Sequence, residues 1–146
     1  MHKKYTSIGL MSGTSGDGVD ASMVYSDGFT ELEPIYDKYF EYDRDIFKSF
    51  HTLKDRINSE DDLKKTDVEL RNLERKITMF HAKILKEFDL KDKNILIGFH
   101  GQTIYHDPNK KISVQLGDGH LLNQLIKRKV IYNFRKNDIL NGGEGA

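Results

Sequence analysis

Residues 5–25 read YTSIGLMSGTSGDGVDASMVY, and this stretch decides how the chain begins to fold. Residues 5–11 are short, apolar and partly β-branched, which is typical of a strand, and residues 19–25 repeat that character. The polar, glycine-rich segment 12–18 lies between them and is short enough to reverse the chain. The pattern therefore predicts a β-hairpin closed by a glycine-rich turn.

A third strand and two helices are expected next. Thr30 to Tyr42 alternates roughly between apolar and polar residues, with Pro34 near its start, and predicts a strand. Apolar residues in 46–57 recur at steps of three and four, which is helical spacing. Residues 59–62 (SEDD) resemble a capping box, which would open one longer helix whose apolar stripe reaches Phe88.

The second half of the chain contains one strongly apolar run. Residues 94–99 (NILIGF) predict a strand that is buried on both faces and ends at a polar segment, 100–103. Residues 112–116 and 130–134 predict two more strands, with a helix over 120–129 between them. The order of elements predicts an α/β fold, a central mixed β-sheet flanked by helices, in one domain.

The composition limits the partners of this chain. Lysine plus arginine equals aspartate plus glutamate, 23 each, which gives no reason to propose nucleic acid or an anionic membrane as a partner. No run approaches the ~20 apolar residues that span a bilayer, and the apolar stretch near the N-terminus is too short for a signal peptide. The chain has no cysteine, which fits a reducing compartment. We therefore expect a cytoplasmic protein.

The glycine-rich turn is the first candidate for chemistry. Its glycines permit positive φ angles and a close approach of the backbone to a ligand, and exposed amides in such a turn can surround an anion. Asp17 and Asp20 supply hard oxygen ligands suited to Mg²⁺, directly or through its waters. The segment is not a Walker A loop, because no Gly-Lys-Ser/Thr follows. On composition alone, a plain hydrophilic hairpin turn is the alternative.

Two further segments carry candidate side chains. His100, Gln102 and Thr103 follow the most apolar strand, where ligands of α/β sheets gather. His100 could donate to an oxygen or act as a base, and the other two could bind sugar hydroxyls; satisfaction by local backbone is the alternative for all three. Arg135 could clamp a carboxylate or phosphate through its planar guanidinium group, or pair with Asp138 instead.

Five segments in this order resemble the anhydro-N-acetylmuramic acid kinase family. They are residues 8–21 (IGLMSGTSGDGVDA), 98–103 (GFHGQT), 114–119 (VQLGDG), 134–138 (FRKND) and 142–146 (GGEGA). Any one alone would be weak, whereas five in the right order are specific. Gly16 stands where the family usually has leucine, and we therefore expect a looser first turn. Glu144 stands where glutamine is common.

The resemblance implies the first lobe of a two-lobed kinase. The family belongs to the sugar kinase, Hsp70 and actin superfamily, in which each lobe has an RNase H-like core (the actin-like ATPase fold) and ATP lies between the lobes. Residues 1–146 would be the N-terminal lobe, and the C-terminal lobe would be absent because we interpret the glycine-rich ending as a cut. The family reaction uses ATP to phosphorylate 1,6-anhydro-N-acetylmuramic acid with hydrolytic ring opening, in peptidoglycan recycling and amino-sugar catabolism.

The resemblance also implies roles for particular residues. The catalytic aspartate is expected in the second lobe, so none is assigned here, and we expect this lobe alone to be inactive. The residues implied for the ATP phosphates are Gly13, Thr14, Ser15, Gly16, Asp17, Gly18, Val19 and Asp20. Of these, Asp17 and Asp20 would hold Mg²⁺, directly or through water. The residues implied for the sugar are His100, Gln102, Thr103 and Arg135.

Two other hypotheses stay open. The chain could be an inactive or split-gene lobe that only binds nucleotide, or that needs a partner, either a complementary C-terminal chain or a second copy in a homodimer. It could instead be an RNase H-like nuclease that uses paired carboxylates. The neutral charge and the lack of a basic stripe count against the nuclease.

Overall fold

A mixed β-sheet is the centre of the fold in this computed structural model, which describes residues 2–145. The strands β1 (Tyr5–Ser12), β2 (Gly18–Ser26) and β3 (Leu32–Glu41) pair antiparallel in chain order. β4 (Leu96–Asp107) lies parallel to β1 on its other side. These pairings confirm the predicted hairpin, the third strand and the mixed sheet.

β4 is long enough to pair with two different strands on its outer side. Its first half pairs in parallel with β6 (Lys129–Tyr132), and its second half pairs antiparallel with β5 (Ile112–Leu116). A short 3-10 turn, η1 (Pro108–Lys110), joins β4 to β5. The sheet therefore has the order β3-β2-β1-β4-β5, with β6 beside β4.

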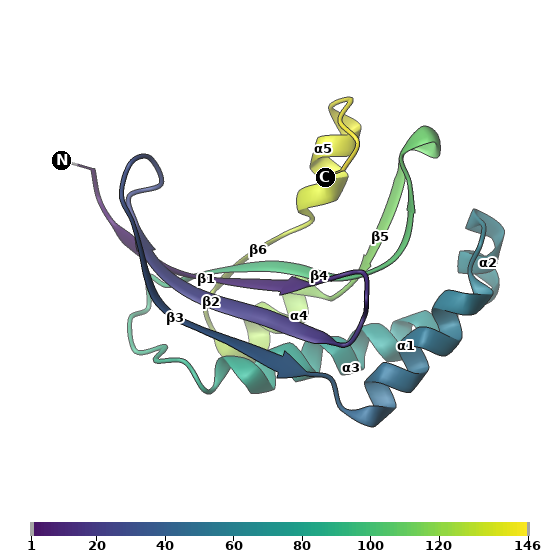
Figure 1. Ribbon diagram of the computed structural model, residues 1–146, viewed down its shortest axis with the longest axis horizontal. Helices are drawn as coiled ribbons and strands as arrows, with labels where there is room; N and C mark the ends of the chain where they lie inside the picture. The colour runs from purple at the N-terminus through teal and green to yellow at the C-terminus, as the bar shows by residue number, and fades with distance from the viewer. Residues whose placement is uncertain (1, 146) are drawn as a thin grey trace.

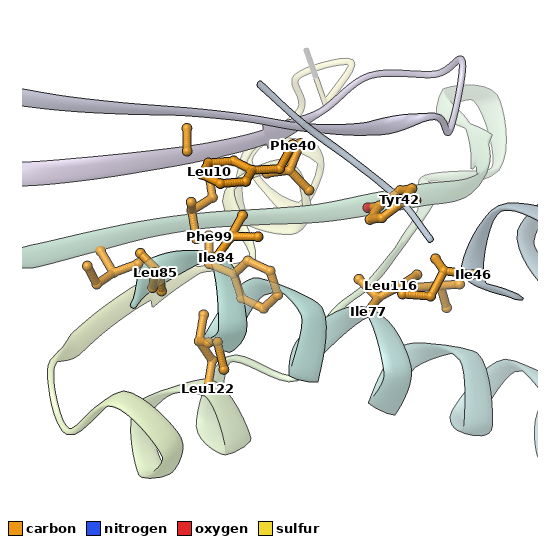
Figure 2. Close-up of a cluster of buried hydrophobic side chains, with 14 of the residues drawn as sticks. Leu10, Phe40, Tyr42, Ile46, Ile77, Ile84, Leu85, Phe99, Leu116 and Leu122 are labelled. Carbon is orange, nitrogen blue, oxygen red and sulfur yellow. The ribbon is translucent and has the colours of Figure 1, made fainter. Parts of the chain in front are cut away.

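Helices cover one face of this sheet. α1 (Arg44–Arg56), α3 (Asp67–Leu85) and α4 (Gly119–Ile126) lie on one side, whereas the short α5 (Phe134–Leu140) lies on the other side with the β5 hairpin (Figure 1). The buried side chains of α1 are Ile46, Phe50 and Leu53, which recur at helical spacing. They join alternate residues of the strands and the apolar face of α3 in a single core, part of which is shown in Figure 2.

The predicted long helix is divided. α2 (Glu60–Lys65) ends at Thr66, and α3 begins at the next residue, so the prediction of one continuous helix after residue 59 is wrong. The Oγ1 hydroxyl of Thr66 donates to the carbonyl oxygen of Asp62 at 2.7 Å. The amide of Thr66 donates to the same oxygen at 3.0 Å, and both bonds close the last turn of α2 on Thr66, whose ψ of 12° departs from helical geometry. Ser59 does cap α2, as the sequence predicted.

Two boundaries near the C-terminus also differ from the prediction. The helix expected over 120–129 ends at Ile126 because Lys127 takes a left-handed conformation with φ of 53°. The strand expected over 130–134 ends at Tyr132, since Asn133 is left-handed at φ 62° and Phe134 already begins α5. Asn tolerates this conformation better than most residues, and here it turns the chain toward the open face of the sheet.

A candidate phosphate-binding loop and the side chains around it

The loop between β1 and β2, residues 13–17, is anchored to β4. The carbonyl oxygen of Gly13 accepts a bond from the amide of Gly16 at 3.2 Å and another from Nε2 of Gln102 at 2.8 Å. The first bond closes a tight turn, in which Gly16 takes φ of +67°. Gln102 is fully buried, so its amide group holds the loop from the interior of the protein.

Two more carbonyl groups of the loop are held by the chain that follows β3. The oxygen of Thr14 accepts a bond from Nζ of Lys54 at 2.7 Å, and the oxygen of Asp17 accepts one from the amide of Tyr42 at 2.8 Å. The C=O and N–H of a trans peptide point in opposite directions. Because the oxygens of Gly13 and Thr14 face protein donors, the amides of Thr14 and Ser15 face away from them.

These outward amides lie at the surface. Gly13, Thr14, Ser15 and Asp17 are exposed, whereas Gly16 is buried. Within residues 2–145, no acceptor forms a hydrogen bond with the amide of Thr14 or Ser15. Adjacent outward N–H groups on a fixed turn are the arrangement that binds anions such as phosphate. The loop is therefore more than a hydrophilic turn, because its shape is set by contacts from three other segments.

A buried chain of hydroxyl and amide groups supports the loop. Oγ of Ser12 lies 3.0 Å from the phenol oxygen of Tyr42, which in turn donates to Oε1 of Gln102 at 3.3 Å. Burial raises the pKa of Tyr42 to about 12, and the Ser12 bond opposes that shift. The phenol therefore stays protonated and donates, which leaves the Gln102 amide nitrogen directed at Gly13.

The two predicted metal ligands differ in their surroundings. Oδ1 of Asp17 accepts a bond from Oγ of Ser15 at 2.5 Å, and this bond, with the backbone of Asp17 itself, lowers the pKa of the carboxyl. Asp20 is exposed on β2. Burial raises the pKa of the Tyr39 phenol first, and the negative charges of Asp17, Glu41 and Asp20 raise it further. Both aspartates therefore lie within electrostatic reach of one phenol.

This donor set suits a magnesium ion that is only partly held by protein. Residues 2–145 contain no cluster of three or more His, Cys, Asp or Glu side chains that could enclose a metal. Mg²⁺ commonly keeps several waters and binds through one or two carboxylates together with substrate phosphates. Asp17 and Asp20 fit that pattern. The neighbouring Val19 does not contribute a side chain, because it is fully buried in the core.

A bulge in β4 separates the predicted sugar residues. The segment 100–103 was predicted to follow the strand, but it lies within β4. Leu10 pairs with Phe99 and then Ser12 with Gln102, so β4 contains one extra residue, and Gly101 lies there with φ of +77°. Phe99 faces α3, and the extra residue turns Gln102 to that same side. The structure therefore does not bring Gln102 together with His100, which faces α5.

His100 forms its contacts on the open face of the sheet. Its Nδ1 lies 2.7 Å from the carbonyl oxygen of Gly101, and its Nε2 lies 2.7 Å from Nε of Arg135 in α5. The guanidinium nitrogen can only donate, so Nε2 accepts and Nδ1 carries the proton. Burial lowers the pKa of His100, the Gly101 bond opposes this, and the Arg135 charge lowers the pKa further. The histidine is thus neutral.

The end of the chain is fastened to α5. Nη1 of Arg135 donates to the carbonyl oxygen of Gly145 at 2.6 Å, and the amide of Gly145 donates to Oδ2 of Asp138 at 2.8 Å. Asp138 thus holds the glycine segment and is not the partner of Arg135. Thr103 lies apart from this group, because its Oγ1 accepts a bond from Nε2 of Gln115 in the β5 hairpin at 3.2 Å.

Three supporting residues were not predicted from the sequence. Tyr42, Phe50 and Lys54 all belong to the region 27–93, where no motif was found. Helical spacing placed Phe50 in the core, but nothing in the sequence pairs it or Lys54 with residues 13–17. Elsewhere, Asp118 caps α4 by accepting a bond from the amide of Leu121 at 2.9 Å.

A concavity of about 780 Å³ is lined by other residues. It is formed by the start of α1, by α3 and by α4, on the helix side of the sheet. None of its lining residues belongs to the loop or to the His100 group. We therefore place the candidate site on the loop geometry. Among the described helices, none is both long and apolar enough to cross a membrane.

The fold and the loop together define a class of protein. An antiparallel β1–β2–β3 unit, parallel strands beyond it and flanking helices are consistent with a lobe of the sugar kinase and actin-like ATPase fold. The chain belongs to the anhydro-N-acetylmuramic acid kinase family, whose profile matches residues 5–146.

Named relatives agree with this assignment. The anhydro-N-acetylmuramic acid kinase of Pelagibacter ubique is 57% identical over 149 residues, an alignment that covers 100% of this chain and 40% of the relative. The enzymes of the same name from Agrobacterium fabrum and Rhizobium etli are 39% and 35% identical and cover 97% of this chain. The chain spans about 40% of the length of these relatives.

Proposed function

We propose that this chain supplies the ATP-phosphate-binding lobe of an anhydro-N-acetylmuramic acid kinase. The observation that carries the proposal is the loop at residues 13–17, whose carbonyls face protein donors and whose amides of Thr14 and Ser15 face solvent. Asp17 is its last residue, and Asp20 follows on β2. Family membership supports the use of ATP, and the loop supplies a physical reason for where the phosphates bind.

The reaction transfers the γ-phosphoryl group of ATP to the 6-oxygen of 1,6-anhydro-N-acetylmuramic acid. Water adds to the anomeric carbon and the bond from that carbon to the 6-oxygen breaks, which yields N-acetylmuramic acid 6-phosphate. Phosphoryl transfer depends on positioning and on neutralising spreading negative charge. The Thr14 and Ser15 amides would orient the phosphates. Asp17 and Asp20 would hold Mg²⁺, whose contribution when bound is further neutralisation.

The sugar would lie toward Arg135. Nε and Nη1 of Arg135 are committed to His100 and Gly145, and its Nη2 has no hydrogen-bond partner among residues 2–145. That free edge could pair with the carboxylate of the muramic acid substrate. His100, neutral and engaged at both nitrogens, would orient Arg135 instead of acting as the base. Gln102 would act through the loop, and Thr103 through the hairpin.

The catalytic base would come from outside the 40% of the relatives' length that this chain spans. We expect the activity to require that remainder, as part of the same polypeptide, as a complementary chain or through a dimer. The kinase would work in the cytoplasm, in the recycling of peptidoglycan fragments. A nucleotide-binding lobe that needs a partner is the second candidate function, and the same partial coverage favours it.

One experiment tests both parts of the proposal. Kinase activity toward the anhydro sugar is measured for this chain and for a form extended to the length of the relatives. We expect activity only in the extended form, and a loss of ~10²-fold or more in turnover for Asp17→Asn. Asp37→Asn, on the exposed part of β3, is the control. Full activity of this chain alone would refute the assignment of the base, and an unchanged Asp17→Asn enzyme would refute the role of the loop.

A further inference from the structure

We infer that α1 positions the phosphate loop, with Phe50 and Lys54 as its two positioning residues. The inference rests on the proposed function only for its effect on phosphate binding. Neither residue belongs to a segment that resembles the family, and no motif in the sequence connects α1 with residues 13–17. The two contacts that carry the inference differ in kind, since one is apolar and one is a hydrogen bond.

The apolar contact joins Phe50 to Gly16. Phe50 is fully buried, with 0% of its surface accessible to solvent. A Cβ atom added to Gly16 would overlap the ring of Phe50. The ring therefore fills the space that a side chain at residue 16 would need. In the structure, the turn that contains Gly16 packs against an aromatic ring supplied by α1.

The hydrogen bond comes from the next turn of the same helix. Lys54 follows Phe50 by four residues and lies on the same face of α1. Its Nζ donates to the carbonyl oxygen of Thr14 at 2.7 Å and lies 5.5 Å from the centre of the Phe50 ring. This bond fixes the peptide between Thr14 and Ser15 from its carbonyl side.

The loop is consequently held from two directions. Gln102 of β4 fixes Gly13, at its start, whereas α1 fixes Thr14 and Gly16, at its middle. Removing the α1 contacts should leave the start of the loop in place and let the middle of the loop sample other conformations. An anion site needs ordered amides at Thr14 and Ser15. If these amides were disordered, each binding event would have to order them, and the loss of conformational entropy would lower the affinity.

The test compares variants of the whole chain without nucleotide. Hydrogen exchange of the Gly16 amide, which is bonded to the carbonyl oxygen of Gly13, and ¹⁵N relaxation of residues 14–17 are measured for Phe50→Ala, Lys54→Met and Lys54→Arg. Lys48→Met, on the exposed side of α1, is the matched control. We expect a rise in exchange of ~10-fold or more for the first two variants, since small local stability differences change opening equilibria strongly. Lys54→Arg should restore most of the protection, because it keeps a donor.

A double substitution isolates the apolar contact. Gly16→Leu alone should disorder the loop, because its side chain and the Phe50 ring cannot occupy the same space. In a Phe50→Ala background the same leucine should be much less harmful, so that the two effects are strongly non-additive. Additive effects would overturn the pairing. Unchanged loop amides in both Phe50→Ala and Lys54→Met would overturn the role of α1.

Binding of MgATP, followed by ³¹P line broadening, completes the experiment. We expect affinity to fall in parallel with loop order, by ~10-fold for Lys54→Met. Disordered loop amides with undiminished MgATP affinity would overturn the link between the loop's order and binding. A wild-type chain that binds no MgATP would contradict the proposed function, whereas the amide measurements would still decide whether α1 positions the loop.

Discussion

Arg135 donates its Nε–H to Nε2 of His100 across 2.7 Å, and this bond sets the protonation state of the histidine. The proton of the ring stays on Nδ1, which donates it to the carbonyl oxygen of Gly101. A helix on the open face of the sheet thereby controls a side chain in the middle of β4. The first prediction follows from the charge of Arg135.

Arg135→Met should raise the pKa of His100. The substitution removes a positive charge and a donor that both favour the neutral ring. Burial, the larger cause of the lowered pKa, stays in place, so the pKa should rise only part of the way to its usual value. An NMR titration of the His100 ring measures this. Lys136→Met, exposed on α5, is the control, and an unchanged pKa in Arg135→Met would contradict the assigned bond.

Gly101→Ala should destabilise the fold by more than its backbone angle explains. Gly101 has φ of +77°, and an added Cβ would lie 2.6 Å from the carbonyl oxygen of Leu116. Gly28 has the same φ of +77° with open space around it. Gly28→Ala should therefore cost about 1–2 kcal/mol, and Gly101→Ala should exceed that value.

The free energy of unfolding in urea is measured for Gly28→Ala and Gly101→Ala. The difference between the two variants isolates the steric clash beside Leu116 from the cost of the left-handed conformation. Equal losses would show that β4 relaxes around the new methyl group, and that the bulge does not need its glycine for space.

His81 should make the protein less stable as the pH falls below neutral. It is fully buried on α3, its Nδ1 bonds the carbonyl oxygen of Ile77 at 2.7 Å, and burial lowers its pKa from 6.5 to about 4. Between these values the unfolded chain binds a proton that the folded chain refuses. Stability should thus be constant above about pH 6.5 and fall by up to about 3 kcal/mol as the pH approaches 4.

Urea unfolding across this pH range measures that slope. His81→Met keeps an apolar side chain of similar length in the core and should flatten the slope between pH 4 and 6.5. The exposed His120→Met is the matched control and should leave the slope as it is in the wild type. A slope that persists in His81→Met would assign the acid sensitivity to other groups.

Gln102→Leu should uncouple the loop from the sheet. The substitution removes one of the two hydrogen bonds of the Gly13 carbonyl oxygen and one of the two of the Tyr42 phenol. Each lost bond costs about 0.5–1.5 kcal/mol. Tyr42→Phe removes the phenol itself and should cost less. Gln124→Leu, on the surface of α4, is the control, and calorimetric unfolding compares the three variants. A loss no larger than that of the control would contradict the buried chain of bonds.

The strands were predictable because their patterns are local. The hairpin of β1 and β2, the third strand and the apolar start of β4 were all expected from alternation or continuous apolar runs. The break at Thr66 and the start of α5 after Asn133 were not. Both depend on a single residue that leaves helical or extended geometry, and periodicity averages over such residues.

The position of the loop was predictable, but the way it is held was not. Glycines and acids in residues 13–20 indicate an anion and cation site from composition. The donors to its carbonyls come from residues 42, 54 and 102, far away in the sequence. The bulge at Gly101 also reverses which face Gln102 occupies, and no alternation pattern reveals an extra residue inside a motif.

The bond from Gln102 to Gly13 joins residues 89 positions apart, and this has a consequence for synthesis on the ribosome. The loop leaves the exit tunnel before the strand that anchors it, which follows roughly 5–20 seconds later at ordinary translation rates. Until then the carbonyl oxygen of Gly13 lacks its bond from Gln102. Full competence to bind phosphate should therefore arise only after the polypeptide has passed residue 102, although the residues that bind are made earlier.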